Sequence, residues 1–524
     1  MPPGHAMPGG VANAPSGPAG PAVASPSPAR AWMLGLGTVV LVFLYLGLGT
    51  TSLPLMDRDE PRFAEASREM LAGGDWIVPR LNGEYRFDKP PVIYWLQAAC
   101  IQWLGRTEAA VRLPSVLCAM LSAAATAAWA ARMGSRRAGA WAASILLTCP
   151  QFYVHAHLAV ADMAMILGFV VAGWCGWELL RPGRRTLLGD GWYWGWLAAL
   201  AWGFLAKGPV AWLPVIPFAW ARWQLARAVP PDIRLPGVRA RDALAGIVVV
   251  LGLVGAWGIP ALTQTQGEFW NVGMGKHVVA RSVGVLEGHG IQGFLGYVGG
   301  LPFYLLAFPI GFLPWSPWLL QRLRVARPWR TSDVATRYVL GGAALVFVVF
   351  TLVRTKLPHY TLPAFPWIAA WLACELDRVG MDPRRFLRLA GVSALVLGLL
   401  AGIALPRASR IVIARDLQRV AAPLLQPRMA VATLGFQEPS IYWYLRPDDG
   451  PWVRHLQTED DAARFLAQPG PRMVLVLGQL RAVASRLEER FPDARTALAQ
   501  GWNPVNGRIV AVHVIERRAA QGEP

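Results

Sequence analysis

Long apolar runs separated by short polar connections dominate the chain. The first run, from Trp32 to about Thr50, is about 20 residues long, as a bilayer core of ~30 Å requires. Ten further runs follow, at 113–131, 138–154, 163–180, 192–206, 208–221, 243–262, 298–320, 336–353, 359–374 and 389–405. The pattern predicts a polytopic all-α membrane protein with about eleven spans, or thirteen if two re-entrant or missed segments are added.

Arginine clusters in the connections set the expected orientation. Their members are Arg132, Arg136 and Arg137; Arg181, Arg184 and Arg185; Arg222, Arg227, Arg234, Arg239 and Arg241; Arg322, Arg324, Arg327 and Arg330; Arg378, Arg384, Arg385 and Arg388. The positive-inside rule places all five clusters in the cytoplasm. The amino terminus is then inside and the carboxyl terminus outside. A crossing by the apolar run Pro90–Leu104 would reverse this placement, so we predict that this run lies on or dips into the interface.

Both ends of the chain differ from this membrane part. Residues 1–30 consist almost wholly of Pro, Ala, Gly and Ser, which predicts a disordered cytoplasmic tail. After Pro406, strands are predicted at 429–435, 473–478 and 508–515, and helices at 459–467 and 479–491. The expected organisation is therefore a tail at 1–30, a membrane domain at 31–406 and a small outer α/β domain at 407–524, which covers the site or docks an acceptor.

Composition and charge support a place in the bilayer. The chain has 524 residues, of which 54% are hydrophobic and 16% charged, and its mean hydropathy is +0.35. A soluble enzyme would contain roughly 25% charged residues. The net charge of +18 comes from arginines between apolar runs, and no nucleic-acid module accompanies it. The bilayer is therefore the expected partner, and nucleic acid is not.

The first outer loop, 51–112, is long and dense in charge, which is typical of functional loops. At its start, Asp59, Glu60 and Pro61 favour a helix N-terminus, so solvated charges on a capped helix are one interpretation. The alternative is chemical, because Asp59 follows the membrane exit, where a lipid-linked head group would lie. On this reading Asp59 acts on that head group, Glu60 lines a cavity for it and Arg62 binds its phosphate.

The end of the same loop has the composition of a phosphate clamp. Arg86 and Lys89 flank Asp88 in the segment Tyr85-Arg86-Phe87-Asp88-Lys89-Pro90, and Tyr94 follows at the expected membrane surface. We predict that Lys89 binds a phosphate and that Asp88 and Tyr94 line the cavity. The simpler interpretation is that these residues mark the headgroup layer.

Two ionisable residues lie at the outer ends of predicted spans. Asp162 is at the mouth of one span, and Lys207 is in the turn Ala206-Lys207-Gly208-Pro209, which faces the same side. An acid at that depth is costly and is a functional candidate, so we predict a catalytic role for Asp162. Lys207 is predicted to line the cavity, with snorkelling to the interface as the alternative.

Further cations occur in the later outer segments. Arg354, Lys356, His359 and Tyr360 form a predicted anion-binding lip where the chain re-enters the membrane, and Arg281 lies in the outer segment 263–297. We expect Lys356 and Arg281 to bind a phosphate carried by lipid, and His359 and Tyr360 to line the cavity.

A metal site is a weaker prediction. Its candidate ligands are Asp88, His155 and His277, but His-x-His outside a strand is a weak signal and ordinary interface histidines explain the pattern as well. We therefore expect that no cofactor is required, and we leave a divalent metal open.

The segment DRDEPRFAEASREMLAGGDWIVPRLNGEYRFDKPPVIYW closely resembles the first outer loop of membrane glycosyltransferases of the GT-C fold. It is most similar to the branch that contains the lipid A aminoarabinose transferases and the protein O-mannosyltransferases. Landmarks in the family's order follow at Arg112-Leu113-Pro114-Ser115, Ala206-Lys207-Gly208-Pro209, Leu313-Pro314-Trp315-Ser316 and Lys356-Leu357-Pro358-His359-Tyr360.

The resemblance implies sugar transfer from a polyprenyl phosphate to an acceptor on the outer face. It implies that Asp59 is the first-loop catalytic acid, that Asp88 and Lys89 are the acid-lysine pair near the donor phosphate, and that Asp162 is the second-loop acid. This chain has Asp-Glu-Pro-Arg and Phe-Asp-Lys-Pro where aminoarabinose transferases commonly have Asp-Glu-Thr-Arg and Phe-Glu-Lys-Pro. These departures concern the sugar and the acceptor and leave the reaction class unchanged.

The expected function is therefore transfer of a sugar from a polyprenyl-phosphate donor to lipid A, of the aminoarabinose type, on the periplasmic face of a Gram-negative inner membrane. Transfer to a protein, as by O-mannosyltransferases, or to another envelope glycan is the alternative within the class. A lipid or solute transporter and a structural envelope partner are the alternatives outside it. A transporter should show helix interruptions in repeated halves and mid-membrane acids, whereas the acids here are predicted at outer ends.

Overall fold

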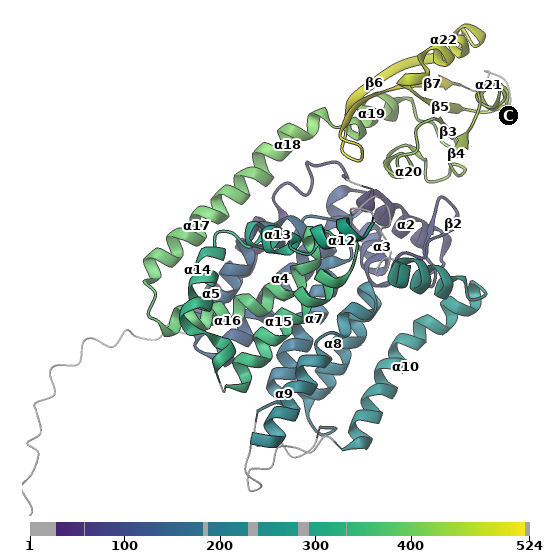
Figure 1. Ribbon diagram of the computed structural model, residues 1–524. Helices are drawn as coiled ribbons and strands as arrows, with labels where there is room; N and C mark the ends of the chain where they lie inside the picture. The colour runs from purple at the N-terminus through teal and green to yellow at the C-terminus, as the bar shows by residue number, and fades with distance from the viewer. Residues whose placement is uncertain are drawn as a thin grey trace, which may run out of the picture. The chain divides into compact units, whose positions relative to one another are not determined.

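We describe a computed structural model of the chain over residues 28–56, 58–181, 187–228, 239–280, 293–331 and 333–518 (Figure 1). The chain divides into two compact units, Met1–Leu44 and Tyr45–Pro524. Helix α1, Pro28–Gly47, contains most of the first predicted span. The predicted disordered tail lies outside the described residues, apart from its last three positions. Everything below concerns the second unit.

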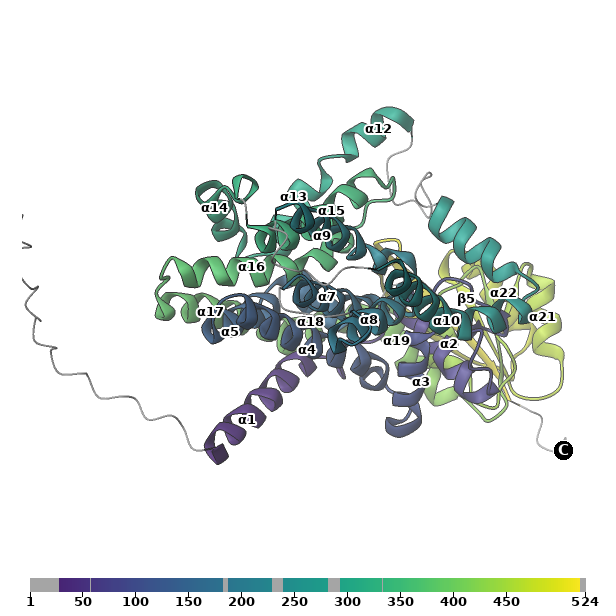
Figure 2. The same ribbon diagram turned by 90° about the horizontal axis from the view of Figure 1, so that it is seen from below.

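Helices form most of the membrane part of this unit. They are α4 (Glu108–Met133), α5 (Arg136–Leu147), α6 (Pro150–Ala156), α7 (Asp162–Leu179), α8 (Gly191–Lys207), α9 (Val215–Ala228), α10 (Ala240–Gln264), α12 (Gly293–Gly300), α13 (Phe303–Gly311), α14 (Ser316–Ala326), α15 (Val334–Leu352), α16 (Phe365–Arg378), α17 (Pro383–Leu399) and α18 (Leu405–Ala408). Short 3-10 turns η1 (Pro209–Trp212), η3 (Pro328–Arg330) and η4 (Pro358–Ala364) and π-helical segments η2 (Phe269–Ala280) and η5 (Leu400–Ala404) connect them. Figure 2 shows α7, α8 and α10 side by side.

Five of the described helices are long and apolar enough to cross a membrane, or six if one bent pair is counted as a single span. They are α4, α7, α10, α15 and the continuous stretch Pro383–Ile411, and the bent pair is Gly296–Gly311 with Ser316–Arg330. These helices confirm a polytopic helical membrane fold. The other predicted runs form shorter or broken helices. Pro150, for example, begins α6 three residues after the end of α5, because proline cannot continue a helix. The count of about eleven spans stays a prediction.

The run predicted to lie at the interface forms α3 (Val92–Leu104), which packs against α2 (Asp59–Gly73). The Ser67 hydroxyl of α2 donates to the side-chain oxygen of Gln97 in α3 over 2.8 Å. Gln97 in turn donates to the backbone oxygens of Val111 and Ala159. Helix α3 has 13 residues, fewer than the ~20 that a span needs. Its buried polar bonds hold it to the first loop and to the start of α4.

The carboxyl-terminal part forms the expected small α/β domain, with one five-stranded sheet. Its strands are β3 (Ala430–Leu434), β4 (Arg454–Leu456), β5 (Arg472–Leu477), β6 (Arg495–Asn503) and β7 (Arg508–Arg517), in the order β4-β3-β5-β7-β6. The first three are parallel, and β7 pairs antiparallel with both β5 and β6. Helices α19 (Ile413–Ala421), α20 (Ser440–Leu445), α21 (Glu459–Ala467) and α22 (Arg481–Arg490) accompany the sheet. Apolar clusters are buried on both of its faces, which makes this part a packed domain.

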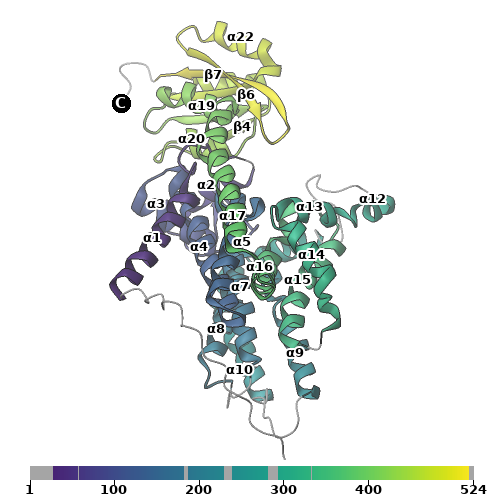
Figure 3. The ribbon, with the colours of Figure 1, turned by 90° about the vertical axis from the view of Figure 1, so that its left-hand side faces the viewer.

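Buried ion pairs join this domain to α2. Glu65 is fully buried and accepts hydrogen bonds from Arg68 of its own helix (2.6 Å) and from Arg446, which follows α20 (2.9 Å). Figure 3 shows the sheet domain next to α2. A charge without a partner would be costly at this depth, so each partner holds the other in place. The domain is thereby fixed on the helix that begins at Asp59.

A β-hairpin from the first loop adds a second connection. Strands β1 (Arg80–Leu81) and β2 (Glu84–Tyr85) are joined by Asn82 and Gly83, both with positive φ (54° and 84°), as an Asn-Gly hairpin turn requires. The Asn82 side chain donates to the carbonyl of Val453 and accepts from its N–H, over 2.9 and 2.8 Å. The sequence of the turn therefore positions an amide that pairs with the carboxyl-terminal domain.

We predict that Arg446→Met weakens this attachment. The substitution removes one cation from the buried carboxylates of α2, which costs about 3 kcal/mol for a buried pair. Thermal unfolding of the detergent-purified chain should show a lower melting temperature and faster proteolysis around residues 406–412. Arg464→Met, which breaks only an exposed pair with Asp461, should leave both unchanged. Equal effects of the two substitutions would contradict the importance of burial.

Glu69 gives the attachment a predicted pH dependence. Burial and the nearby charge of Glu65 raise the pKa of Glu69 from its usual 4.5 to about 7. Between these values the unfolded chain loses the proton while the folded chain keeps it, so stability should fall by about 3 kcal/mol as the pH rises from 4.5 to 7. Melting temperatures across this range should fall more steeply for the original chain than for Glu69→Gln. Parallel curves would show that Glu69 does not titrate in this window.

Candidate functional site

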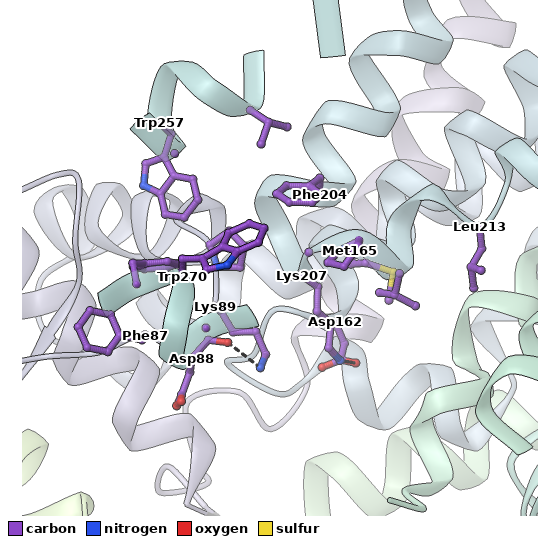
Figure 4. Close-up of a pocket in the computed structure, with 18 of the residues that line it drawn as sticks. Phe87, Asp88, Lys89, Asp162, Met165, Phe204, Lys207, Leu213, Trp257 and Trp270 are labelled. Carbon is purple, nitrogen blue, oxygen red and sulfur yellow. Dashed lines mark hydrogen bonds and ion pairs between the residues drawn. The ribbon is translucent and has the colours of Figure 1, made fainter. Parts of the chain in front are cut away.

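A cavity of about 700 Å³ lies where the end of the first loop meets the ends of α7, α8 and α15, beside α10 and η4 (Figure 4). One part of its wall is polar and contains Asp88, Lys89, Asp162, Lys207, His359 and Tyr360. The volume is within the range typical of ligand sites. The structure therefore brings together six residues that the sequence analysis selected from four separate segments. Their roles stay predictions.

Asp162 and Lys207 form an ion pair in this wall. Asp162 is the first residue of α7 and Lys207 the last of α8, so each charge is favourable for its own helix dipole. Their side chains are only 10% and 16% exposed, so the loss of either partner would leave the other as a buried charge without compensation. Gly208 follows with φ 87°, a conformation that glycine adopts without strain, and turns the chain into η1. The Lys-Gly sequence thus places the ammonium at the cavity wall.

Aromatic rings lie beside this pair. The rings of His155 and His359 are 5.0 Å apart, and Tyr360 contacts both His359 and Phe350. Nδ1 of His155 is 2.9 Å from the backbone oxygen of Gln151, which fixes the ring. Both histidines are close enough to Asp162 to interact with its charge. The turn η4 and the end of α6 therefore contribute rings and hydrogen-bonding groups to the same region.

Arg86 connects the cavity with the start of α2. Its guanidinium pairs with Asp88 over 2.7 Å and donates to the Tyr94 hydroxyl over 3.1 Å. Although burial acts to lower the pKa of Arg86, Tyr94, Asp88 and Asp59 together raise it above its usual value. Asp59 is exposed at the first turn of α2. The charge of the Asp59 carboxylate therefore acts on Arg86, the same cation that pairs with Asp88.

The lining residues Asp88, Lys89, Asp162 and Lys207 sum to zero charge, and Arg86, which pairs with Asp88 from behind the wall, brings the sum to +1. Arg86 balances Asp88, and Lys207 balances Asp162. Lys89 adds a further cation, and its ammonium donates to the backbone oxygen of Asp88 over 3.0 Å. A positive wall of this kind attracts an anionic group such as a phosphate.

The rest of the cavity wall is apolar, and most of it was missed in the sequence analysis. It includes Met165, Phe204, Leu251, Trp257, Phe269 and Trp270. The Trp257 and Phe269 rings pack edge to face at 5.1 Å, and the Trp257 indole donates to the carbonyl of Ile77. Aromatic residues are common at membrane interfaces, so the aromatic residues of α10 and η2 did not by themselves indicate a cavity. They give the cavity a surface suited to a hydrocarbon chain.

Glu60 and Tyr94, both predicted to line the cavity, lie in other buried contacts. Glu60 pairs with Arg112 over 2.9 Å, and both side chains are at most 2% exposed. Arg112 also donates to the backbone oxygens of residues 50, 53 and 54. Tyr94 is fully buried on α3 and accepts from Arg86. Among the described residues, these two are absent from the cavity wall.

Three of the predicted phosphate ligands are not in the described cavity wall: Lys356 and Arg62 have other contacts, and Arg281 is not among the described residues. The Lys356 ammonium donates to the carbonyls of Phe350, Thr351 and Val353 and so caps the end of α15. Arg62 is half-buried on α2, where its charge acts on Tyr442 of the carboxyl-terminal domain. Arg281 lies outside the described residues. Lys89 is therefore the predicted phosphate ligand that the structure places in the cavity wall.

The described residues contain no group of three or more metal-binding side chains. Asp88 and His155, two of the proposed ligands, have the partners given above, and the side chain of the third, His277, lies outside the description. The expectation that no cofactor is needed, with a divalent metal left open, stays a prediction.

Comparison with known proteins identifies relatives of the chain. Residues 88–231 match the family described as dolichyl-phosphate-mannose-protein mannosyltransferase. The chain is 32% identical over 371 residues to the undecaprenyl phosphate-alpha-4-amino-4-deoxy-L-arabinose arabinosyl transferase of Edwardsiella ictaluri, covering 69% of this chain and 62% of that protein. A Sodalis glossinidius transferase of the same description is 31% identical, with 70% and 64% covered. The chain thus spans less than two thirds of the length of these curated relatives.

Solved structures extend the likeness to the fold. The crystal structure of ArnT from Cupriavidus metallidurans bound to undecaprenyl phosphate superposes with a TM-score of 0.71 at 21% identity, covering 93% of this chain and 98% of that one. Its apo form gives 0.69. The resemblance found in the sequence is therefore confirmed: the chain is a multi-pass membrane protein with the GT-C fold of the ArnT structures, similar in sequence to the undecaprenyl phosphate-aminoarabinose transferases.

Proposed function

We propose that the chain transfers a sugar from a polyprenyl-phosphate donor to lipid A, in an aminoarabinose-type modification. One observation carries this proposal: a cavity with a positive polar wall and a large apolar wall lies next to the helix that begins at Asp59. The curated relatives, named for undecaprenyl phosphate-aminoarabinose, support the choice of donor and sugar.

The donor would bind with its chain and its phosphate on different walls. The apolar wall formed by α8, α10 and η2 accepts the first isoprenoid units, because burial of hydrocarbon is favourable. The phosphate lies against Lys89, with Lys207 held nearby by Asp162. In this placement the sugar extends toward the first loop and α2.

The reaction is a substitution at the anomeric carbon. Its bond to the phosphate oxygen breaks, the electron pair leaves with the phosphate, and a bond forms to the acceptor oxygen with inversion. Asp59 accepts the proton of an acceptor hydroxyl, or hydrogen-bonds to an acceptor phosphate and polarises it. Lys89 stabilises the charge of the departing phosphate. Because phosphate is a good leaving group, positioning and charge neutralisation supply most of the barrier reduction.

The proposed location is the bacterial inner membrane, with the amino terminus in the cytoplasm. Its support is the distribution of the five arginine clusters, which the positive-inside rule assigns to one face. The cavity lies at the start of α7 and the end of α15, whereas the described cluster members Arg181 and Arg330 lie at the opposite ends of these helices. The carboxyl-terminal domain, attached to α2, is then periplasmic, where the lipid A acceptor would meet it.

A second candidate acceptor is a protein. The match of residues 88–231 to the mannosyltransferase family favours it, because that segment contains Asp88, Lys89, Asp162 and Lys207. The two candidates share a polyprenyl-phosphate donor and differ in the sugar and in the acceptor, so the test must examine both acceptors.

Lys89 and Lys356 should behave differently in donor binding. Lys89→Gln removes a cation from the cavity wall and should weaken the binding of undecaprenyl phosphate about tenfold or more, as expected for a lost charged hydrogen bond. Lys356→Gln is the matched control, since its ammonium caps α15, and it should lower the melting temperature while leaving affinity nearly unchanged. Titration of the purified variants with the lipid distinguishes them. A larger loss of affinity in Lys356→Gln would reverse the assignment.

The function itself is tested by mass spectrometry of lipid A and of periplasmic proteins. Cells without the gene should lack an aminoarabinose-sized mass on lipid A, the original gene should restore it, and Asp59→Asn should not. The Asp59→Asn protein should still bind undecaprenyl phosphate, because Asp59 is outside the cavity wall. Glu84→Gln, an exposed acid of the same loop, should restore the modification fully.

Each other result has a defined meaning. A sugar lost from proteins in place of lipid A would select the second candidate. Activity retained by Asp59→Asn would exclude its catalytic role. No change in lipid A or protein would exclude both acceptors and favour another glycan or a transporter.

A further inference from the structure

A second cavity, of about 620 Å³, lies between α9, α14, α15 and α16. Its wall is almost wholly apolar and includes Trp220, Leu323, Trp329, Leu340, Phe347 and Ile368. It shares no lining residue with the cavity described above. The proposed sugar transfer gives this second cavity no role.

The two cavities follow one another along α15. The second is lined by residues from Thr336 and Arg337, near the start of the helix, as far as Phe347, and the first is lined by residues from Val349 onward at the carboxyl-terminal end. Helix α15 has 19 residues, so its ends are about 28 Å apart, close to the thickness of a bilayer core. The polar edge of the second cavity, at Thr336 and Arg337, is therefore level with the opposite leaflet, which is the cytoplasmic one in the proposed orientation.

The polar groups of this cavity are cationic at its edge. Arg337 donates from Nε to the carbonyl of Thr331 over 2.6 Å and from Nη1 to Gln224 over 3.5 Å, which uses two of the five N–H groups of a guanidinium. Pro328 and Trp329 line the cavity, and their chain neighbours Arg327 and Arg330 are exposed. An apolar space is thus bordered by several arginines.

The acids near these arginines already have other partners. Asp333 accepts from the N–H groups of Ala335 and Thr336 and so caps α15. Glu375 of α16 pairs with Arg322 and Arg378. The edge of the cavity is therefore positive, and the start of α15 adds its dipole to that charge.

We propose that this cavity binds one acyl chain of an anionic glycerophospholipid, whose phosphate is held by Arg337. Charge complementarity identifies the occupant, because basic pockets between membrane helices on the cytoplasmic side bind anionic head groups. A zwitterionic lipid would bring a second positive charge to the same arginines. The described lining of this second cavity contains no lysine and no acid, whereas the first cavity, proposed to bind a polyprenyl phosphate, has Asp88, Lys89 and Asp162 in its wall.

The test is native mass spectrometry of the full chain with phosphatidylglycerol and with phosphatidylcholine of the same acyl chains. The original chain should retain phosphatidylglycerol on the order of tenfold better, because both lipids have a phosphate but only phosphatidylcholine adds a cation that the arginines repel. Arg337→Gln should remove this preference. Gly341→Leu should reduce retention of both lipids, because a Cβ there lies 3.6 Å from the Trp220 ring and its side chain would enter the cavity without changing the charge.

Arg388→Gln is the control, since it removes an exposed arginine from α17 and should leave the preference unchanged. Melting temperatures identify any variant that fails to fold, and Gly341→Leu supplies an independent test if Arg337→Gln does. Equal retention of the two lipids by the original chain, an equal loss in Arg388→Gln, or displacement of phosphatidylglycerol by undecaprenyl phosphate would each overturn the proposal. Because no step depends on sugar transfer, failure here leaves the proposed function untouched.

Discussion

The buried ion pair between Glu60 and Arg112 is the interaction on which the candidate site depends. Arg112 binds the carbonyls at the end of the first span, and Glu60 accepts from the N–H of Ala159, three residues before Asp162. One pair therefore fixes the start of α2, the first turn of α4 and the segment leading into α7. Removing either partner would leave a buried charge, which costs several kcal/mol. The positions of Asp59 and Asp162 both follow from this pair, although neither belongs to it.

The same requirement for paired charges explains the electrostatics of the cavity. Asp162 with Lys207, and Asp88 with Arg86, can be placed near the membrane because each acid has a cation within bonding distance. Counted with Arg86, which lies outside the cavity wall, the charged side chains of the wall sum to +1. An anionic head group is thus attracted without an unpaired acid opposing it. This balance suits a ligand that is a phosphate at one end and a hydrocarbon at the other.

The sequence predicted the cavity better than it predicted the roles around it. Asp88, Lys89, Asp162 and Lys207 were selected because charges at the outer ends of spans are costly, and the structure gathers them at one cavity. Glu60 and Lys356 look the same in sequence, but their partners, Arg112 and the last carbonyls of α15, are set by packing. No local sequence pattern assigned Trp257 and Phe269 to a cavity. In the carboxyl-terminal domain, β3, β5 and β7 had clear apolar patterns, whereas short β4 and half-exposed β6 did not.

The attachment of the carboxyl-terminal domain changes what that domain can do. The sequence suggested a cover or an acceptor-docking module, but Glu65, Arg446 and Asn82 bind it to the helix that presents Asp59. Helix α2 is held at its start by the Glu60–Arg112 pair and along its middle by this domain. A displacement of the domain would therefore move Asp59 relative to Lys89, which lies on a different segment of the loop. In the proposed mechanism a shift of 1 Å between reacting groups would cost about 100-fold in rate, so the domain would contribute to the geometry of that mechanism.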